Sequence, residues 1–229
     1  MAVETKGFWD IDFSTVDWAD IWQATEDTLA MLGFSALFTI IVGLPLGVML
    51  FLVSRGQMLS NRPLYWGLSL IINVLRSIPF VILMILFMPF TKWIMNTSIG
   101  VEGSIPPLVI GAVPFFARLV EVSLREVDRG VIEAAQAMGA SHWEIVRRVL
   151  LPESRAGLMA GATITTVTLV SYTAMAGLIG GGGLGDMAIR YGYQRFDTAV
   201  MLITVFILIV LVALLQAAGD RLVIRYSRK

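Results

Sequence analysis

The sequence predicts an all-α membrane protein with five transmembrane helices per chain, and two observations carry this prediction. Hydrophobic residues make up 57% of the 229 residues, and the mean hydropathy is +0.79. Charged residues make up only 15%, against about 25% in an average soluble domain. The formal net charge is zero, which argues against nucleic acid as a partner, because phosphate binding needs a concentrated basic surface.

The five predicted spans follow from length and composition. A helix needs about 20 apolar residues to cross the hydrocarbon core of a bilayer. Five stretches meet this need and form a predicted transmembrane domain over residues 29–218, with spans at about 29–53, 65–90, 105–124, 156–180 and 198–218. The third is interrupted by Arg118 and Glu121, but their i, i+3 spacing lets them pair on one helix face.

The distribution of basic residues predicts the orientation. With the N-terminus outside, the cytoplasmic loops and the C-terminal tail together hold eleven lysines and arginines, and the N-terminal segment and the external loops together hold four. Because cytoplasmic loops carry the excess of basic residues, we expect the N-terminus outside and the C-terminus in the cytoplasm. Residues 1–28, with seven acids, one lysine and interleaved aromatics, are then an external segment at the membrane surface, and residues 219–229 are a basic cytoplasmic tail.

The spans carry breaks that plain membrane anchors lack. Pro45, Pro79 and Pro114 lie within the first three spans, and proline frees backbone groups that neighbouring helices or water must satisfy. Glycines recur four apart, as in Gly43 and Gly47, a spacing that lets helices approach closely. These patterns predict a tightly packed bundle, in which simple helix packing accounts for many of the glycines.

Signatures of catalysis are absent from the sequence. The single histidine rules out zinc sites built on a pair of histidines, and without cysteine there is no thiolate nucleophile; we expect no metal site. The run GLIGGGGLGD has no Gly-Lys-Ser/Thr ending, so it is not a nucleotide-binding loop. We therefore expect no catalytic residues, and we interpret the glycines after the fourth span as an outer hinge or a closely packed helix end: Gly180, Gly181, Gly182, Gly183 and Gly185.

The segment from Glu133 to Pro152 is polar although it lies between two apolar spans. Val131, Ala134, Ala135 and Met138 form an apolar stripe at helical spacing, which predicts a short helix. Gly139 then permits a sharp turn, and Ser141 and Glu144 fit a capping box that starts a second helix. The resulting elbow could enter a groove of another protein or pack on its own bundle, and the residues alone favour neither.

This stretch resembles the EAA motif of the permeases of ABC importers, E-A-A-x3-G-x9-I-x-L-P, with Val149 in place of the isoleucine. In that family the segment is a coupling helix, here residues 129–152, which docks into a groove of a separate cytoplasmic ATPase. The resemblance implies a coupling role for seven residues: Glu133, Ala134, Ala135, Met138, Gly139, Leu151 and Pro152.

From about residue 25 onward, the chain is similar to the permeases of methionine importers, as in NVLRSIPFVILM and YTAMAGLIGGGGLGDMAIRYGYQRF. The resemblance implies a type I importer permease fold and a multi-pass location in the bacterial inner membrane. It implies a homodimer with two ATPase subunits and an external methionine-binding lipoprotein. ATP and magnesium would bind to the ATPase, and this chain would bind no cofactor and would not be an enzyme.

A translocation path for L- or D-methionine would then run between the spans. We expect Arg76, Ser77, Tyr172 and Met175 to line or gate it, with hydroxyls from the fourth span. Arg118 and Glu121 could take part in transport or form a structural ion pair, and the sequence favours neither. About half of the threonines would form helix–helix hydrogen bonds instead of lining the path. The alternatives are a permease for another amino acid or small solute, an ATP-independent secondary transporter or channel, and a structural membrane scaffold.

Overall fold

The computed structural model describes residues 13–227. All the regular secondary structure that it assigns within these residues is helical. Four helices are long and apolar enough to cross a membrane: α1 (Trp18–Val53), α4 (Gly100–Arg125), α8 (Arg155–Ala176), which a 3₁₀ turn extends to Ile179, and α10 (Thr198–Ser227). A fifth crossing exists only if α2 (Arg62–Ser77) and α3 (Phe80–Met95) together make one span.

The predicted span over 65–90 consists of two helices, α2 and α3, which are bent by 109° at the break between them; that the pair crosses the membrane as one span stays a prediction. Ile78 has an extended conformation, with φ −80° and ψ 127°. A residue before proline is pushed out of the helical region by the proline ring, and Pro79 also lacks the N–H that would continue the helix. Pro45 and Pro114 cause no such break, since α1 and α4 run through them.

Helix α1 begins at Trp18, eleven residues before the first predicted span. Asp17 accepts a hydrogen bond from the Ala19 N–H at 2.9 Å, which caps the helix start. Ile21 and Ala24 are buried in a core cluster with Leu184. The second half of the predicted external segment 1–28 is thus the first part of a long helix, and residues 1–12 lie outside the described residues.

The chain forms two compact units, and each comprises three stretches of sequence. Unit 1 contains residues 1–35, 80–108 and 168–214, and its core cluster includes Leu184, Met187 and Val200. It also holds α9 (Gly183–Met187) and a wide π-helical turn over Ala188–Tyr193.

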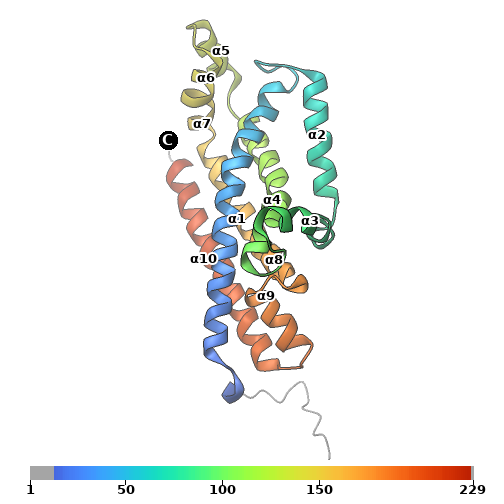
Figure 1. The fold of residues 1–229 in the computed structure, drawn as a ribbon. Helices are drawn as coiled ribbons and strands as arrows, with labels where there is room; N and C mark the ends of the chain where they lie inside the picture. The colour runs from blue at the N-terminus through green and yellow to red at the C-terminus, as the bar shows by residue number, and fades with distance from the viewer. Residues whose placement is uncertain (1–12, 228–229) are drawn as a thin grey trace, which may run out of the picture. The chain divides into compact units, whose positions relative to one another are not determined.

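Unit 2 contains residues 36–79, 109–167 and 215–229, and within it α1 packs closely on α4. A Cβ atom added to Gly43 would lie 2.8 Å from the Phe116 ring, and one added to Gly47 would lie 2.5 Å from the Ala117 carbonyl oxygen. The predicted close approach at these glycines is therefore present. Short helices α5 (Arg129–Ala137), α6 (His142–Ile145) and α7 (Leu151–Glu153) follow one another at one end of this unit (Figure 1).

The tail predicted at 219–229 continues the helix instead of leaving it, because α10 extends to Ser227. A Cβ atom added to Gly219 would collide with the Thr163 side chain, so α10 approaches α8 closely there. Residues 228–229 lie outside the described residues.

Candidate functional site

We call residues 129–153 the elbow; it begins with α5. Asp128 caps this helix by accepting a hydrogen bond from the Gly130 N–H at 2.7 Å. Ile132 and Ala135 are buried, whereas Val131, Ala134 and Met138 are exposed, Met138 to 82%. The predicted stripe is therefore wrong as a single face: Ala135 faces the core, and the other three form an apolar surface on the outside.

The turn after α5 has the shape that the sequence predicts. Gly139 has a φ of +81°, in the left-handed region that side chains with a Cβ rarely adopt. Its N–H donates to the Gln136 carbonyl at 2.9 Å, and the Ala140 N–H donates to the Ala135 carbonyl at 3.1 Å. These bonds close the helix end, so the direction of the chain after α5 is fixed by backbone geometry.

The predicted capping box is present at the start of α6. The Glu144 N–H donates to the Ser141 hydroxyl oxygen at 3.4 Å, and the Ser141 N–H donates to the Glu144 carboxylate at 3.0 Å. The Ser141 hydroxyl donates to the same carboxylate at 2.8 Å. The backbone N–H, followed by this hydroxyl, holds the pKa of Glu144 below its ordinary value, because both stabilise the ionised form.

The second predicted helix widens before it reaches the proline. Residues Val146–Leu150 form a π-helical turn, in which the Leu151 N–H donates to the Val146 carbonyl five residues back. Pro152 has no backbone N–H and cannot donate the hydrogen bond of a regular helix. Two residues later, the Ser154 hydroxyl donates to the Leu150 carbonyl at 2.7 Å. Arg155 then begins α8.

The elbow is anchored on its own bundle. Ile132, Ala135, Ile145 and Leu150 share one buried cluster with Phe116 and other side chains of α1 and α4. The Arg129 guanidinium donates to the Gly56 carbonyl at 3.3 Å and lies 3.4 Å from the Glu133 carboxylate. The packing of the elbow on its own bundle is therefore present, and its other face is exposed in the described chain; docking of that face on another protein stays a prediction.

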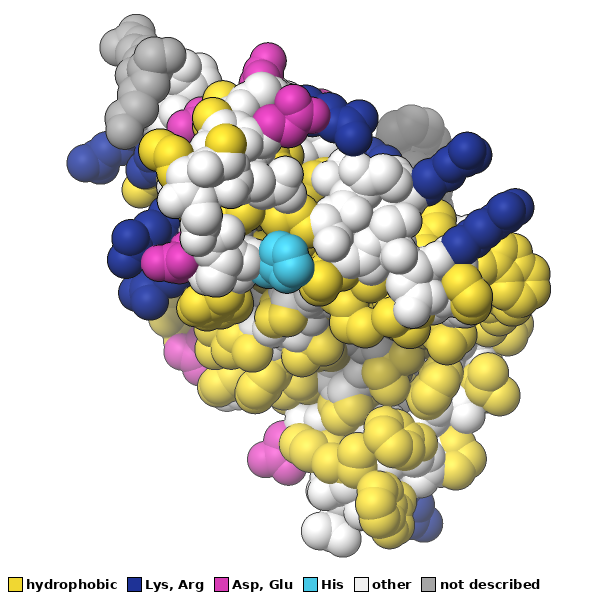
Figure 2. Space-filling model, turned by 90° about the horizontal axis from the view of Figure 1, so that it is seen from above, with side chains coloured by type: hydrophobic (Ala, Val, Ile, Leu, Met, Phe, Trp, Pro, Cys, Tyr) yellow, Lys and Arg dark blue, Asp and Glu magenta, His cyan; other side chains and the backbone are white. Residues whose placement is uncertain are grey.

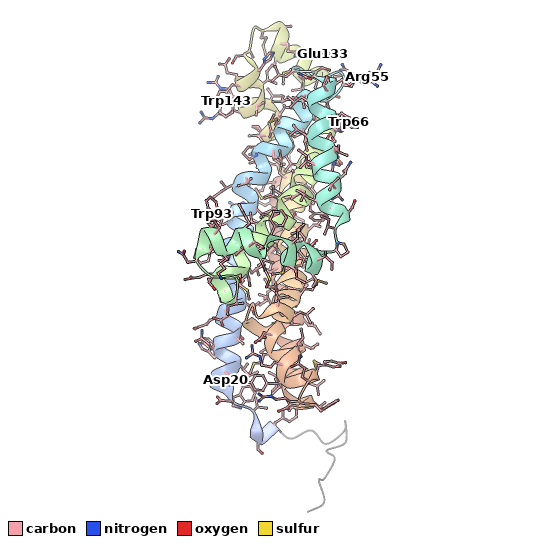
Figure 3. The ribbon with its side chains drawn as sticks, turned by 45° about the vertical axis from the view of Figure 1, so that its right-hand side comes forward. Asp20, Arg55, Trp66, Trp93, Glu133 and Trp143 are labelled. Atoms are coloured by element: carbon pink, nitrogen blue, oxygen red, sulfur yellow. The ribbon has the colours of Figure 1, made fainter. Side chains whose placement is uncertain are left out.

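The seven predicted coupling residues divide between these two faces. Glu133, Ala134, Met138 and Gly139 are exposed, and Figure 3 shows Glu133 on α5 at this end of unit 2. Ala135 is buried, and Leu151 and Pro152 are half-buried. The exposed set offers a partner a small apolar surface beside a carboxylate, while the inward set holds the elbow in shape.

The predicted pathway residues of α2 lie at its end, before the break. Arg76 is exposed and its guanidinium lies 5.8 Å from the centre of the Phe115 ring, a cation–π contact. The Ser77 hydroxyl donates to the Asn73 carbonyl at 2.7 Å. The serine hydroxyl is therefore already engaged within its own helix.

The predicted pathway residues of α8 lie in unit 1. Tyr172 stacks on Phe80, with ring centres 3.9 Å apart and planes 3° from parallel, and Met175 is exposed. Three threonine hydroxyls donate to carbonyls four residues back within α8 itself, and not to another helix as the structural alternative expected: Thr163, Thr165 and Thr166. The role of Tyr172 and Met175 in a path stays a prediction.

The glycine-rich segment of unit 1 is held by both conformation and packing. Gly180, Gly182 and Gly183 have positive φ values between +77° and +81°. A Cβ atom added to Gly181 would lie 2.6 Å from the Ser104 hydroxyl, and one added to Gly185 would collide with the Ala174 backbone. Of the two interpretations, the closely packed helix end is what these contacts describe; hinge motion stays a prediction.

Sequence reasoning found the pair Arg118–Glu121 and missed the network around it. Arg118 lies 2.5 Å and Arg125 lies 2.6 Å from the Glu121 carboxylate, which is 2% exposed. The Tyr65 hydroxyl of α2 donates to the same carboxylate at 3.1 Å. The i, i+4 spacing of Glu121 and Arg125 could have indicated that Arg125 is a second partner of the carboxylate. Tyr65 is 56 residues from Glu121 in the sequence, so no local pattern indicated this contact.

The chain matches a known protein family over most of its length. Residues 40–228 match the family described as "Binding-protein-dependent transport system inner membrane component". The chain belongs to this family. It is therefore a membrane component of a transport system, and since the family consists of transport subunits, the prediction that it is not an enzyme is confirmed.

Individual relatives agree with the family assignment. The chain is 49% identical over 206 residues to a probable D-methionine transport system permease protein MetI of Vibrio cholerae, covering 90% of this chain and 92% of the relative. It is 44% identical to the methionine import system permease protein MetP of Bacillus subtilis, covering 91% and 94%.

A solved structure supports the fold. A chain of the MetNI methionine ABC transporter in an inward-facing conformation superimposes with a TM-score of 0.90 at 46% identity, covering 93% of this chain and all of that chain. The predicted all-helical type I importer permease fold is confirmed, with four or five candidate spans.

Proposed function

We propose that this chain is the permease subunit of an ATP-driven methionine importer of the bacterial inner membrane. The observation that carries the proposal is the elbow, whose EAA motif presents Glu133, Ala134, Met138 and Gly139 outward from a closed, capped turn. Relatives that are 44–49% identical are named for methionine transport, which supports methionine as the substrate.

The assembly in this proposal contains two copies of the permease, two ATPase subunits that bind ATP and magnesium, and an external methionine-binding lipoprotein. Each elbow docks on one ATPase, and ATP-driven closure of the ATPases moves the elbows. Because the inner face of α5 and α6 shares one cluster with α1 and α4, motion of the elbow is carried into the helices of unit 2, and alternating access follows.

Proteoliposomes test the transport function. Vesicles with the permease, its ATPase and the binding protein should take up radiolabelled methionine only when ATP is enclosed with the ATPase sites. Uptake by vesicles that contain the permease alone would instead support a secondary transporter or channel. Uptake of another amino acid in preference to methionine would keep the ATP-driven permease and reject the substrate.

Docking is tested by pull-down of the ATPase with permease variants. Glu133→Ala should weaken capture, and Glu102→Ala, a change of another exposed acid at the start of α4, should leave it unchanged. Wild-type capture by Glu133→Ala would contradict the coupling role of this carboxylate.

Orientation is tested by labelling single cysteines, since the chain contains none of its own. A membrane-impermeant maleimide applied to intact cells should modify Glu102→Cys and spare Glu133→Cys. Labelling of both, or only of the second, would contradict an external N-terminus.

A further inference from the structure

An apolar groove lies in unit 2, apart from the outward face of α5. Its volume is about 640 Å³, and α1, the loop before α2, the first turn of α2, and the segment from α6 to α7 supply its walls. The lining side chains are Leu44, Pro45, Val48, Met49, Leu52, Val53, Leu59, Asn61, Leu64, Trp143, Val146 and Leu151.

The lining of this groove suits a hydrocarbon chain. Asn61 is its only lining residue with an amide or charged side chain, and the Asn61 side-chain oxygen already accepts a hydrogen bond from the Leu64 N–H at 3.1 Å. A polar ligand would therefore find few partners, and water would have too few hydrogen bonds to stay. An acyl chain would instead gain dispersion contacts with the leucine, valine and methionine side chains.

Two exposed arginines are sequence neighbours of residues that line the groove. Arg62 follows the lining residue Asn61, and Arg147 follows the lining residue Val146; both side chains are exposed. Within residues 13–227 neither forms an ion pair with a carboxylate, and the first turn of α2 contains no acidic residue. The positive end of the α2 dipole adds to this charge. Figure 2 shows this end of the molecule, where blue arginine and lysine side chains and magenta acidic ones lie beside apolar yellow ones.

Trp143 indicates the depth at which the groove meets the membrane. It lines the groove and is nevertheless 68% exposed. Tryptophan is enriched at the level of the lipid headgroups, where its apolar ring and its N–H are both satisfied. Trp66 of α2 is exposed to a similar extent and labelled with Trp143 and Arg55 in Figure 3, at this end of unit 2.

We propose that this groove binds an anionic phospholipid of the inner leaflet, with an acyl chain between α1 and Trp143 and the phosphate headgroup at Arg62 and Arg147. The proposal rests on the proposed function, which puts the elbow on the cytoplasmic side. Basic pockets between membrane helices on the cytoplasmic side are suited to anionic headgroups. Since Trp143, Val146 and Leu151 belong to the elbow, the bound lipid would hold α6 and α7 against α1.

Native mass spectrometry of the permease–ATPase complex tests this site. Complexes in detergent are titrated with phosphatidylglycerol or phosphatidylcholine, and the fraction with lipid bound is measured. We expect preference for phosphatidylglycerol. The double variant Arg62→Gln/Arg147→Gln should lower phosphatidylglycerol affinity about 25-fold, about fivefold for each arginine. Leu59→Trp should block the groove and lower the affinity for both lipids.

Controls separate this site from general surface charge. Arg221→Gln/Arg225→Gln removes two exposed arginines of α10 that do not border the groove, and it should leave the affinity unchanged. Equal binding of the two lipids, or wild-type phosphatidylglycerol affinity in the Arg62/Arg147 double variant, would overturn the proposal. Efficient disulfide formation between two Leu59→Cys copies would also overturn it, because a second permease would then cover the groove.

The test is independent of transport. Selective phosphatidylglycerol binding that the groove variants abolish would stand even if methionine uptake failed. Conversely, methionine uptake with no lipid preference would reject the lipid site and leave the proposed function intact.

Discussion

Replacing Gly139 by valine tests whether the docking partner recognises the shape of the elbow. At φ +81° a residue with a Cβ is strained, and the left-handed conformation costs about 1–2 kcal/mol. No atom lies within 4 Å of a Cβ built at this position, so this cost lies in the backbone and not in crowding. A free energy of that size lowers the population of the observed turn, and with it ATPase affinity, about 5–30-fold.

The assay is ATPase binding to immobilised permease, measured over a range of ATPase concentrations. Gly139→Asn is the matched variant, because asparagine tolerates the left-handed region better than other residues, and it should bind nearly as the wild type does. The melting temperature of the permease should fall in the valine variant by no more than a cost of about 1–2 kcal/mol gives, and it should change little in the asparagine variant. Equal ATPase affinity for the valine variant, the asparagine variant and the wild type would refute the reasoning.

Three further predictions concern stability, each measured as a melting temperature of the purified permease. Ser141→Ala removes the cap of α6 and should cost about 1 kcal/mol. The pKa of Glu144 is lowered in the folded state. The contribution of that carboxylate to stability is therefore present above about pH 4.5 and is lost as the pH falls below it. Glu121→Gln removes a buried carboxylate from the partly buried Arg118 and the exposed Arg125 and should cost about 3 kcal/mol. Gly185→Ala places a methyl group against the Ala174 backbone and should cost about 1–3 kcal/mol.

Each of these has a matched control. Ser60→Ala changes an exposed loop serine and should have no effect at any pH. Glu133→Gln removes an exposed ion pair and should cost less than about 1 kcal/mol. Gly67→Ala adds a methyl group with no atom within 4 Å and should be neutral or stabilising. A control that is as destabilising as its partner variant would contradict the corresponding argument.

Local features of the elbow could be predicted from the sequence because neighbouring residues determine them. The capping box needs only Ser141 and Glu144 three residues apart, and the turn needs only a glycine that tolerates a positive φ. The face of α5 that is buried could not be predicted in this way. A nine-residue helix with apolar residues at both Val131 and Ile132 offers two stripes, and the cluster with Ile145 selects the second.

Proline also shows why hydropathy predicts spans better than it predicts their continuity. Pro45, Pro79 and Pro114 all lie in apolar stretches, and only Pro79 separates two helices. The hydrogen bond from Tyr65 to Glu121 could not be predicted from the sequence either, because residues on α2 and α4 come into contact only when the two helices pack. The family resemblance, and not periodicity, supplied the coupling role and the substrate class.

The π-helical turn at Val146–Leu150 sets the rotational phase of α8. An α-helix turns about 100° per residue, so one additional residue in a turn shifts every later side chain by about that angle around the axis. The wide turn thus contributes to the rotation that places Gly157 against Ser123. A one-residue deletion between Val146 and Leu150 would close the turn into an ordinary helix and present a different face of α8, although no residue of α8 itself had changed.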